Sequence, residues 1–323
     1  MSQPRRTQVH VDGPLTNISI AFSQSAENFI ADKVFPILPV PKQSDTFFTY
    51  DRTDFFRVDT KKRAPGTESA GSGYNMDDDN YFCDVFALHK DIDDQLRGNA
   101  DSPIDLDRDA TEFLTLDTLL NREQEWVNAF FDTSLWTGSL TAGDITPGDL
   151  WDTVAGTPLD DISEQADSMA EKTGKRPNTF VCGPEVWKEL KEHPDTLDRI
   201  KFGSNSGSPA IVNKNLFAQL IEVDNVFVPQ ATRNTAGESE TAVYDFFYGK
   251  DAMLLYVEPQ PGILKASAGY TFSWTGLGAN NFGTAITKMR AELLKSDRIE
   301  IENAFDQKQI APDLGVFFSA VVS

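Results

Sequence analysis

Two acidic segments of the 323-residue sequence contain residue types that often carry out chemistry in proteins. Three consecutive aspartates at 77–79 could bind a divalent cation, but they lack the one-three-five spacing and the distal glutamate of a calcium loop. His89 precedes segment 90–94, which holds three aspartates, and a histidine beside carboxylates can act as a general base. Because neither segment has a nucleophile or a further metal ligand, we interpret 77–79 as a solvated acidic loop and His89 as structural or interfacial.

Other catalytic and ligand-binding motifs are missing from the sequence. Segment 173–176, Thr-Gly-Lys-Arg, lacks the upstream glycine and the following Ser or Thr of a phosphate-binding loop. Segment 71–73, Gly-Ser-Gly, lacks the third glycine of a dinucleotide-binding loop. The three histidines are widely separated, and Cys83 and Cys182 lie in apolar segments where buried, reduced thiols are expected. We therefore predict that the protein is not an enzyme and has no catalytic residue, no metal site and no cofactor.

The composition restricts the possible partners. With 50 acidic and 29 basic residues, the formal net charge of −21 argues against a nucleic-acid-binding module, which would present a basic face. The N-terminus is polar and basic with no apolar stretch behind it, and no apolar run approaches the ~20 residues that span a bilayer. We therefore expect a protein that is made and folded in a cytoplasm, without membrane association. The 23 phenylalanines are expected to pack in a core or in interfaces.

The N-terminal third is expected to contain segments that a single chain cannot bury by itself. In residues 1–43, prolines at 36, 39 and 41 exclude a helix while the residues between them are apolar, so we predict an extended arm lying against another surface. Residues 46–60 and 81–92 are predicted to form the strands of a long hairpin. Its Gly/Ser/Pro-rich tip has three basic residues on one side and three aspartates on the other. Such a ribbon is marginal alone in water and needs a partner surface.

The remaining sequence predicts one long helix followed by alternating helices and strands. Apolar residues recur every three, four and seven positions between 106 and 135, which predicts an amphipathic helix about 40 Å long. From about residue 156 the pattern changes to mixed α and β, so the fold class is α+β. The expected elements are helices at 157–174, 184–192 and 216–220, a polar surface loop at 195–210, strands at 179–182 and 226–228, strands at 242–247 and 252–257 joined across 249–251, and strands at 287–293, 299–302 and 315–323.

Several short motifs follow one another in the first half of the chain. Residues 29–40 read FIADKVFPILPV, an aromatic strand ends in DFFR at 54–57, RAPG follows at 63–66, YFCDVFALHKDIDD occupies 81–94, and LDRDATE at 106–112 enters the long helix. Their order and spacing together resemble the major capsid proteins of tailed double-stranded-DNA bacteriophages. The resemblance is densest over residues 29–136 and continues loosely to the C-terminus.

The resemblance implies the HK97-like capsid fold and a division of this chain into four parts. These are an N-terminal arm at 1–43, an extended E-loop hairpin at 44–92, a P-domain at 93–150 and 282–323 with a spine helix at about 106–135, and an A-domain at 151–281. It also implies self-assembly through hexamers and pentamers into an icosahedral virion capsid around packaged double-stranded DNA, which the chain would contact non-specifically. Assembly would take place in the host bacterial cytoplasm with a separate scaffolding protein, a portal protein and, optionally, decoration proteins.

The residues expected to contact neighbouring subunits come from the arm and the hairpin. They are aromatic, aliphatic and charged side chains of those two segments: Phe35, Ile37, Leu38, Phe47, Phe48, Phe55, Phe56, Lys61, Lys62, Arg63, Asp77, Asp78 and Asp79. Some members of the family crosslink a hairpin lysine to a neighbour's asparagine, and here Lys61 or Lys62 with Asn303 would be the candidates. No matching motif is present, so we interpret the basic residues as solvated or ion-paired.

Three alternatives remain open at this point. An encapsulin-like nanocompartment shell shares the implied fold and would enclose cargo protein instead of DNA. A soluble α/β enzyme of hydrolase type could use region 156–260, and a stable monomer with a deep pocket would favour it. A nucleic-acid-binding module would require salt-sensitive binding of the free subunit to DNA.

Overall fold

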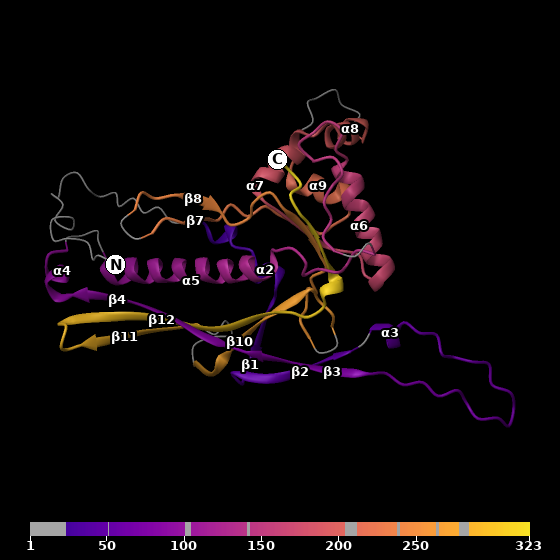
Figure 1. Ribbon diagram of the computed structural model, residues 1–323. Coiled ribbons are helices and arrows are strands. Elements are labelled where there is room, and N and C mark those ends of the chain that lie inside the picture. Colours follow the sequence, from indigo (N-terminus) through magenta and orange to yellow (C-terminus); the bar gives the residue numbers. More distant parts are fainter. Residues whose placement is uncertain are drawn as a thin grey trace.

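The computed structural model describes residues 24–50, 52–100, 105–140, 143–203, 212–237, 240–262, 265–277 and 284–323. The first 23 residues of the expected arm therefore lie outside the described residues. Figure 1 shows a long helix above an elongated sheet, a second sheet with a group of helices beside it, and a ribbon that projects from the body on one side. No helix in the described ranges is both long and apolar enough to cross a membrane.

The elongated sheet has five strands and is organised around β12, a strand near the C-terminus. β12 (Ser296–Gln309) pairs antiparallel with β4 (Asp84–Asp93), β10 (Gly269–Trp274) and β11 (Thr284–Ala291), and β1 (Ile37–Val40) runs parallel to β10. Ile299, Ile301 and Phe305 are buried while polar residues alternate with them, as expected for a strand with one face on a core. The short helix α4 (Asp94–Gly98) follows β4, and a 3-10 turn, η2 (Thr275–Leu277), follows β10.

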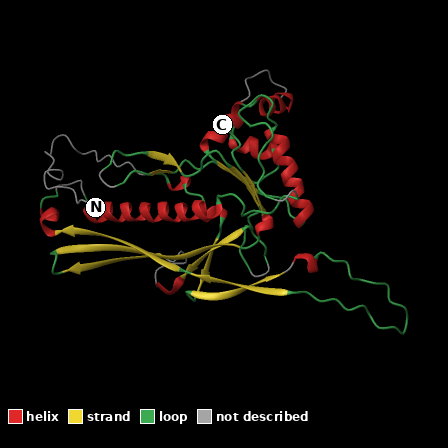
Figure 2. Cartoon of the chain, in the orientation of Figure 1, coloured by secondary structure: helices red, strands yellow, loops and turns green. Residues whose placement is uncertain are grey.

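The long helix α5 (Leu106–Phe130) covers one face of this sheet (Figure 2). The Asp105 carboxylate caps the first turn of this helix. It accepts hydrogen bonds from the backbone N–H groups of Asp107 and Arg108, at 3.2 and 3.3 Å. Ala110 and Leu114 are buried and pack on Ile299 and Ile301 of β12. The predicted apolar stripe thus exists and joins helix and sheet.

The helix ends at Phe130 and not near residue 135 as the sequence predicted. The Trp136 side chain folds back and donates its Nε1–H to the Phe130 carbonyl oxygen at 2.8 Å. Ser134 adopts a left-handed φ of 66°, and its N–H donates to the Asp144 carboxylate at 2.8 Å. This turn stops the helix by means of two side chains whose positions the helical periodicity does not reveal.

The second sheet has four strands in the order β13 (Gly315–Phe318), β9 (Ala252–Leu255), β5 (Thr179–Cys182) and β6 (Asn225–Phe227). Four helices pack on one face of it: α6 (Pro158–Thr173), α7 (Pro184–Glu192), α8 (Pro194–Gly203) and α9 (Lys214–Leu220). β5 and β9 are buried throughout, in keeping with their apolar sequences. Pro158 begins α6 and Gly174, with a φ of 70°, ends it, as predicted.

The structure differs from the sequence expectations at three places in this half. Part of the predicted loop 195–210 is helix α8, because Pro194 begins a helix instead of only ending one, and residues 204–211 lie outside the described ranges. β8 (Tyr244–Phe246) pairs with β7 (Thr232–Asn234), so it forms no hairpin with the buried central strand β9. The last strand, β13, follows a 3-10 turn, η3 (Pro312–Leu314). It ends at Phe318 and pairs with β9, whereas the preceding strand, β12, lies in the five-stranded sheet.

The predicted hairpin exists, but its returning strand is shorter and earlier than expected. β2 (Ser44–Tyr50) pairs antiparallel with β3 (Met76–Phe82), and a short helix, α3 (Arg52–Phe55), occupies part of the expected strand 46–60. The expected strand 81–92 is divided at the buried Cys83, whose N–H donates to the Gln43 carbonyl oxygen at 2.9 Å and closes the base of the ribbon. β4 then joins the five-stranded sheet. Residues 57–75 contain neither helix nor strand (Figure 2).

Candidate assembly surface

The base of the β2–β3 ribbon is fixed to the body of its own subunit. Tyr81 and Phe47 both stack on Phe272 of β10, with ring centroids 4.5 and 5.4 Å away. Just beyond β2, the Arg52 guanidinium donates to the Asp313 carboxylate at 2.6 Å, and Asp313 also forms an ion pair with Lys172 of α6 at 2.8 Å. These contacts set the direction in which the ribbon leaves the body.

Beyond its base, the ribbon presents apolar side chains to solvent. Phe48 is 60% exposed and Val58 is 89% exposed, and Phe55, Phe56, Tyr74 and Met76 are each more than half exposed. Phe55 and Tyr74 contact each other across the loop with centroids 5.7 Å apart, yet they shield little of one another. Because monomeric proteins rarely leave a group of large apolar side chains on a projection, this surface is typical of a contact with another chain.

The predicted charge clusters of the hairpin lie at different places and do not meet. Lys61 and Lys62 are exposed on the loop and have no ion-pair partner within the described residues, and Arg63 donates its Nε–H to the Thr67 carbonyl oxygen at 2.5 Å. Asp77, Asp78 and Asp79 are exposed on β3, in register with Thr49, Phe48 and Phe47 of β2. Neither cluster neutralises the other, so both remain available to a partner.

The apolar strap that follows the first part of the arm lies on its own subunit. The strap comprises residues 26–41 and begins with a 3-10 turn, η1 (Ala26–Asn28), and helix α2 (Ala31–Val34). Phe35 is fully buried and its ring lies 4.8 Å from Phe130 and 5.8 Å from Trp126 of α5. Ile37 and Leu38 are half-buried in β1, beside β10. The expectation that a neighbour must cover the strap is corrected here, and Phe35 is not part of the exposed surface.

A buried carboxylate, which the sequence analysis missed, holds this strap on α5. Glu123 is 0% exposed and accepts hydrogen bonds from the backbone N–H groups of Ile30 (3.0 Å) and Ala31 (2.9 Å) and from the Tyr248 hydroxyl (2.5 Å). Burial raises the pKa of Glu123 above its usual range, although the three donors act in the opposite direction. Burial and the neighbouring carboxylate likewise raise the pKa of Tyr248. One side chain thus joins the strap, the long helix and the segment before β9.

The adjacent Arg122 makes a second polar link in the same core. Its guanidinium donates to Asp32 at 2.7 Å and to the Asn303 side-chain oxygen at 2.9 Å, and it lies 5.0 Å from the centre of the Phe305 ring. Asn303 is 1% exposed, so the candidate crosslinking acceptor is not at the surface of the subunit. The available sequence signal was the placement of Arg122 and Glu123 between apolar helix positions that face the core.

The acidic segment after His89 is engaged in ion pairs. Asp91 accepts from Arg298 at 2.8 Å, and Asp94 accepts from Arg290 at 2.5 Å. At the start of α5, the Asp107 carboxylate accepts hydrogen bonds from Arg97 at 2.7 Å and from Lys288 at 2.8 Å. These hydrogen bonds lower the pKa of Asp107. His89 itself is exposed and lies opposite Glu300 of β12. The arrangement connects β4, α5, β11 and β12 and is a structural network.

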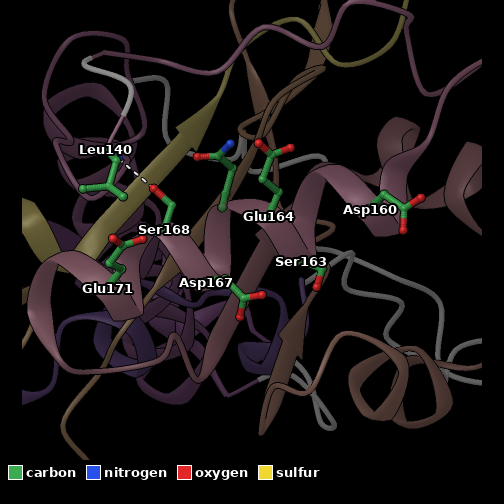
Figure 3. Close-up of a pocket in the computed structure, with 8 residues that line it drawn as sticks. Leu140, Asp160, Ser163, Glu164, Asp167, Ser168 and Glu171 are labelled. Carbon is green, nitrogen blue, oxygen red and sulfur yellow. Dashed lines mark hydrogen bonds between the residues drawn. The ribbon is translucent and has the colours of Figure 1, made fainter.

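The described residues also offer little for catalysis or metal binding. No group of three or more His, Cys, Asp or Glu side chains in those ranges could hold a metal ion. Figure 3 shows a hollow along α6 whose lining residues are an aliphatic side chain, hydroxyls, an amide and carboxylates. It contains no histidine, cysteine or lysine that would activate a nucleophile.

Comparison with known proteins relates this architecture to phage capsids. No family model matches the chain. The major capsid protein of Pseudomonas phage JBD67 is 26% identical over 321 residues, covering 97% of both chains. The major capsid protein of Burkholderia phage BcepMu is 22% identical over 316 residues, covering 96% of both.

Solved structures show the same similarity in three dimensions. A phage-related protein from Bordetella bronchiseptica RB50 superposes with a TM-score of 0.69 at 19% identity, covering 93% of this chain and 95% of that one. The mature capsid of bacteriophage PhiM1 gives 0.62 at 11% identity, with 96% and 92% covered. The SrpI encapsulin from Synechococcus elongatus PCC 7942 gives 0.58 at 13% identity, with 96% and 94% covered.

The fold that these neighbours share with the chain is the HK97-like capsid fold, of class α+β. Within that class, the sequence relationships make this chain a homologue of the major capsid proteins of phages. The resemblance inferred from the motif order is therefore confirmed. The identity to the encapsulin is only 13%, so that similarity shows a common fold and nothing further.

Proposed function

We propose that the chain is the major capsid protein of a tailed phage and that its copies assemble through hexamers and pentamers into an icosahedral virion shell around packaged double-stranded DNA. The observation that carries this proposal is the similarity to two phage major capsid proteins over nearly the whole length of each. The projecting ribbon supports it physically. Its exposed Phe48, Val58 and Met76 have no cover within the described residues, and another copy would supply one.

The proposal assigns a role to each part of the chain and to its partners. The arm at 1–43, the E-loop hairpin at 44–92, the P-domain at 93–150 and 282–323 and the A-domain at 151–281 remain our proposed division. The residues of the arm and hairpin that are not buried would contact neighbouring subunits. A separate scaffolding protein and a portal protein would act during assembly in the host bacterial cytoplasm, and decoration proteins could be added later. Packaged DNA would be contacted without sequence specificity, since the net charge of the chain is −21. The chain would have no enzymatic role.

Electron microscopy of the purified protein, alone and co-expressed with the scaffolding protein of its phage, tests the proposal. We expect closed shells, or rings of five or six subunits. A monodisperse monomer under every condition, with the ribbon resistant to protease, would contradict the assembly role.

An encapsulin-like shell is the second candidate because the SrpI complex shares the fold. The two candidates differ in their contents, since an encapsulin encloses protein cargo. Nuclease-protected DNA in particles isolated from phage lysates would support the phage capsid, and a co-purifying cargo protein without DNA would support the nanocompartment.

A further inference from the structure

A buried histidine lies at the junction between α7 and α8 (Figure 1). His193 is 5% exposed, whereas His89 is exposed on β4. Because α7 ends at residue 192 and α8 begins at residue 194, His193 is the single residue between the two helices, and its extended ψ of 133° makes the turn. Histidine is the side chain whose charge ordinarily changes between pH 5 and pH 8, so its burial at a joint raises the question of what protonation would do there.

The hydrogen-bond partners of the His193 ring fix which nitrogen carries the proton. Nε2 lies 3.0 Å from the Thr153 carbonyl oxygen, a group that can only accept. Nδ1 lies 3.2 Å from the backbone nitrogen of Asp195, whose N–H can only donate. The ring is therefore neutral with its proton on Nε2, and Nδ1 caps the first turn of α8 as an asparagine or aspartate oxygen does in other helices.

The loop that carries the Thr153 carbonyl is fixed on its other sides. The same carbonyl oxygen accepts from the Gly156 N–H at 3.1 Å, and a Cβ atom on Gly156 would lie 2.5 Å from the Leu150 carbonyl oxygen, so the turn is tight. Trp151 is fully buried and donates its N–H to the Val321 carbonyl oxygen at 2.8 Å. A change at the ring is therefore expected to move the start of α8 and not the loop.

Protonation of Nδ1 would convert the capping acceptor into a donor. Two donors would then face each other, the ring Nδ1–H and the Asp195 N–H, and the imidazolium charge would lie at the positive end of the ten-residue helix α8. A replacement acceptor lies in the same turn. The Asp195 carboxylate uses Oδ1 for Arg199 at 3.2 Å, and its Oδ2 is buried without a hydrogen-bond partner among the described residues.

Charged groups on each element around the ring bear on this exchange. They are Asp152 in the loop, Asp160 and Asp161 on α6, Glu192 on α7, and Asp195 and Arg199 on α8. Arg199 is held by Asp160 at 2.5 Å as well as by Asp195, and Asp161 accepts from the Trp151 Nε1–H at 2.8 Å. Because most of these groups are acidic, an imidazolium would form in a negative environment.

We propose that His193 is an acid-responsive switch at the α7–α8 junction. When Nδ1 takes a proton from solvent, the ring gives up the Asp195 N–H, donates to the Asp195 carboxylate instead, and the first turn of α8 opens. The hydrogen bond from Nε2 to Thr153 is kept in both states, so the ring remains the pivot. The inference goes beyond the proposed function and concerns the single subunit, so its failure would leave the capsid proposal untouched.

Amide hydrogen exchange of the purified subunit gives the first test. Between about pH 7.5 and about pH 5, exchange in segment 194–199, corrected for the intrinsic pH dependence of exchange, should become about fivefold faster, the equivalent of losing one helix cap. Helix α9 is the internal control, because its cap is the non-titrating Asn213 side chain, which accepts from the Leu216 N–H at 2.8 Å. Equal protection of 194–199 at both pH values would overturn the proposal.

Three substitutions separate the switch from a general effect of acid. His193→Asn keeps a capping oxygen that does not titrate, so the exchange of α8 should no longer depend on pH. His89→Asn removes an exposed histidine and should leave the response intact. Asp195→Asn removes the carboxylate that would receive the imidazolium and should move the midpoint of the response to lower pH. A response that persists in His193→Asn, or a midpoint that Asp195→Asn leaves in place, would overturn the proposal.

Nitrogen-15 NMR of the histidine side chains needs no substitution and decides the question even if His193→Asn does not fold. At about pH 7.5 the His193 ring should carry its proton on Nε2, and at about pH 5 it should be protonated on both nitrogens. A ring with its proton on Nδ1 at the higher pH, or one that stays neutral at the lower pH, would overturn the switch.

Discussion

The junction around Glu123 buries its polar and apolar groups, whereas the loop at 57–75 exposes them to solvent. At the junction, strap, helix and sheet bury their aromatic rings, and the Glu123 carboxylate receives donors from Ile30, Ala31 and Tyr248. On the loop, Val58, Tyr74 and the basic side chains face solvent. The first region is complete within one chain, whereas under the proposed function another copy would cover the second. Substitutions in the two regions should therefore affect different quantities: the free energy of unfolding at the junction and the yield of particles at the loop.

Shortening the loop should have the largest effect on assembly and almost none on stability. Replacing residues 57–73 by a short Gly/Ser turn removes exposed groups and the half-buried Asp59, so the melting temperature should change by less than about 3 °C, while particle formation is abolished. Calorimetry and electron microscopy of the same preparation measure both. Normal shells from this variant would show that the loop is dispensable.

The paired substitutions Phe35→Ala and Phe48→Ala sharpen the contrast. Phe35 is fully buried, and its truncation leaves a cavity that should lower the free energy of unfolding by about 3–5 kcal/mol. Phe48 is 60% exposed, and its truncation should cost less than about 0.5 kcal/mol while reducing particle yield. Denaturant unfolding distinguishes the two. Equal loss of stability would remove the distinction between the regions.

Glu123→Ala should destabilise the subunit by about 3 kcal/mol, because three buried donors lose their acceptor. Glu125, an exposed residue of the same helix, provides the control, and its substitution by alanine should be nearly neutral. Increased protease cleavage near residue 30 is expected only for the Glu123 variant. An unaffected Glu123→Ala variant would mean that water satisfies the junction.

The smallest effects concern pH, and they have opposite signs at two places. The raised pKa of Glu123 means that the folded state binds its proton more tightly, so this contribution to stability is lost as pH rises through the folded-state pKa, above about 4.5. The lowered pKa of Asp107 gives a contribution that is present at neutral pH and lost as pH falls below about 3.8. We would measure the free energy of unfolding against pH for both variants. Glu123→Gln should lose the decrease at rising pH, and Asp107→Asn should lose the decrease at falling pH. The reverse assignment of the limbs would contradict both environments.

The sequence predicted regular elements well where local patterns decide them. Pro158 and Gly174 bound α6 because proline and glycine act through their own backbone geometry. The end of α5 was missed because Trp136 and Asp144 determine it from outside the helix. The division of the expected strand 81–92 at Cys83 was missed. The alternation of apolar and polar residues predicts a strand but not which strand each half pairs with.

The candidate surface was predictable in part for the same reason. Aromatic and basic residues of the hairpin could be recognised from the segment itself, and the structure leaves most of them exposed. Phe35 was assigned to a neighbour because the prolines around it exclude a helix, but nothing in that segment shows that α5 of the same chain covers it. Glu123 was missed because its three donors come from residues 30, 31 and 248.

The position of β12 has a consequence for the folding of the protein during its synthesis. This strand, which ends at Gln309, pairs with β4 about 200 residues earlier and with β10 and β11, so the sheet closes only when nearly the whole chain has left the ribosome. Pairings of such long sequence separation fold slowly. A prematurely terminated chain would lack the central strand that seats β4 behind the ribbon. Under the proposed function, completed synthesis would thus be a checkpoint that keeps incomplete chains out of a growing shell.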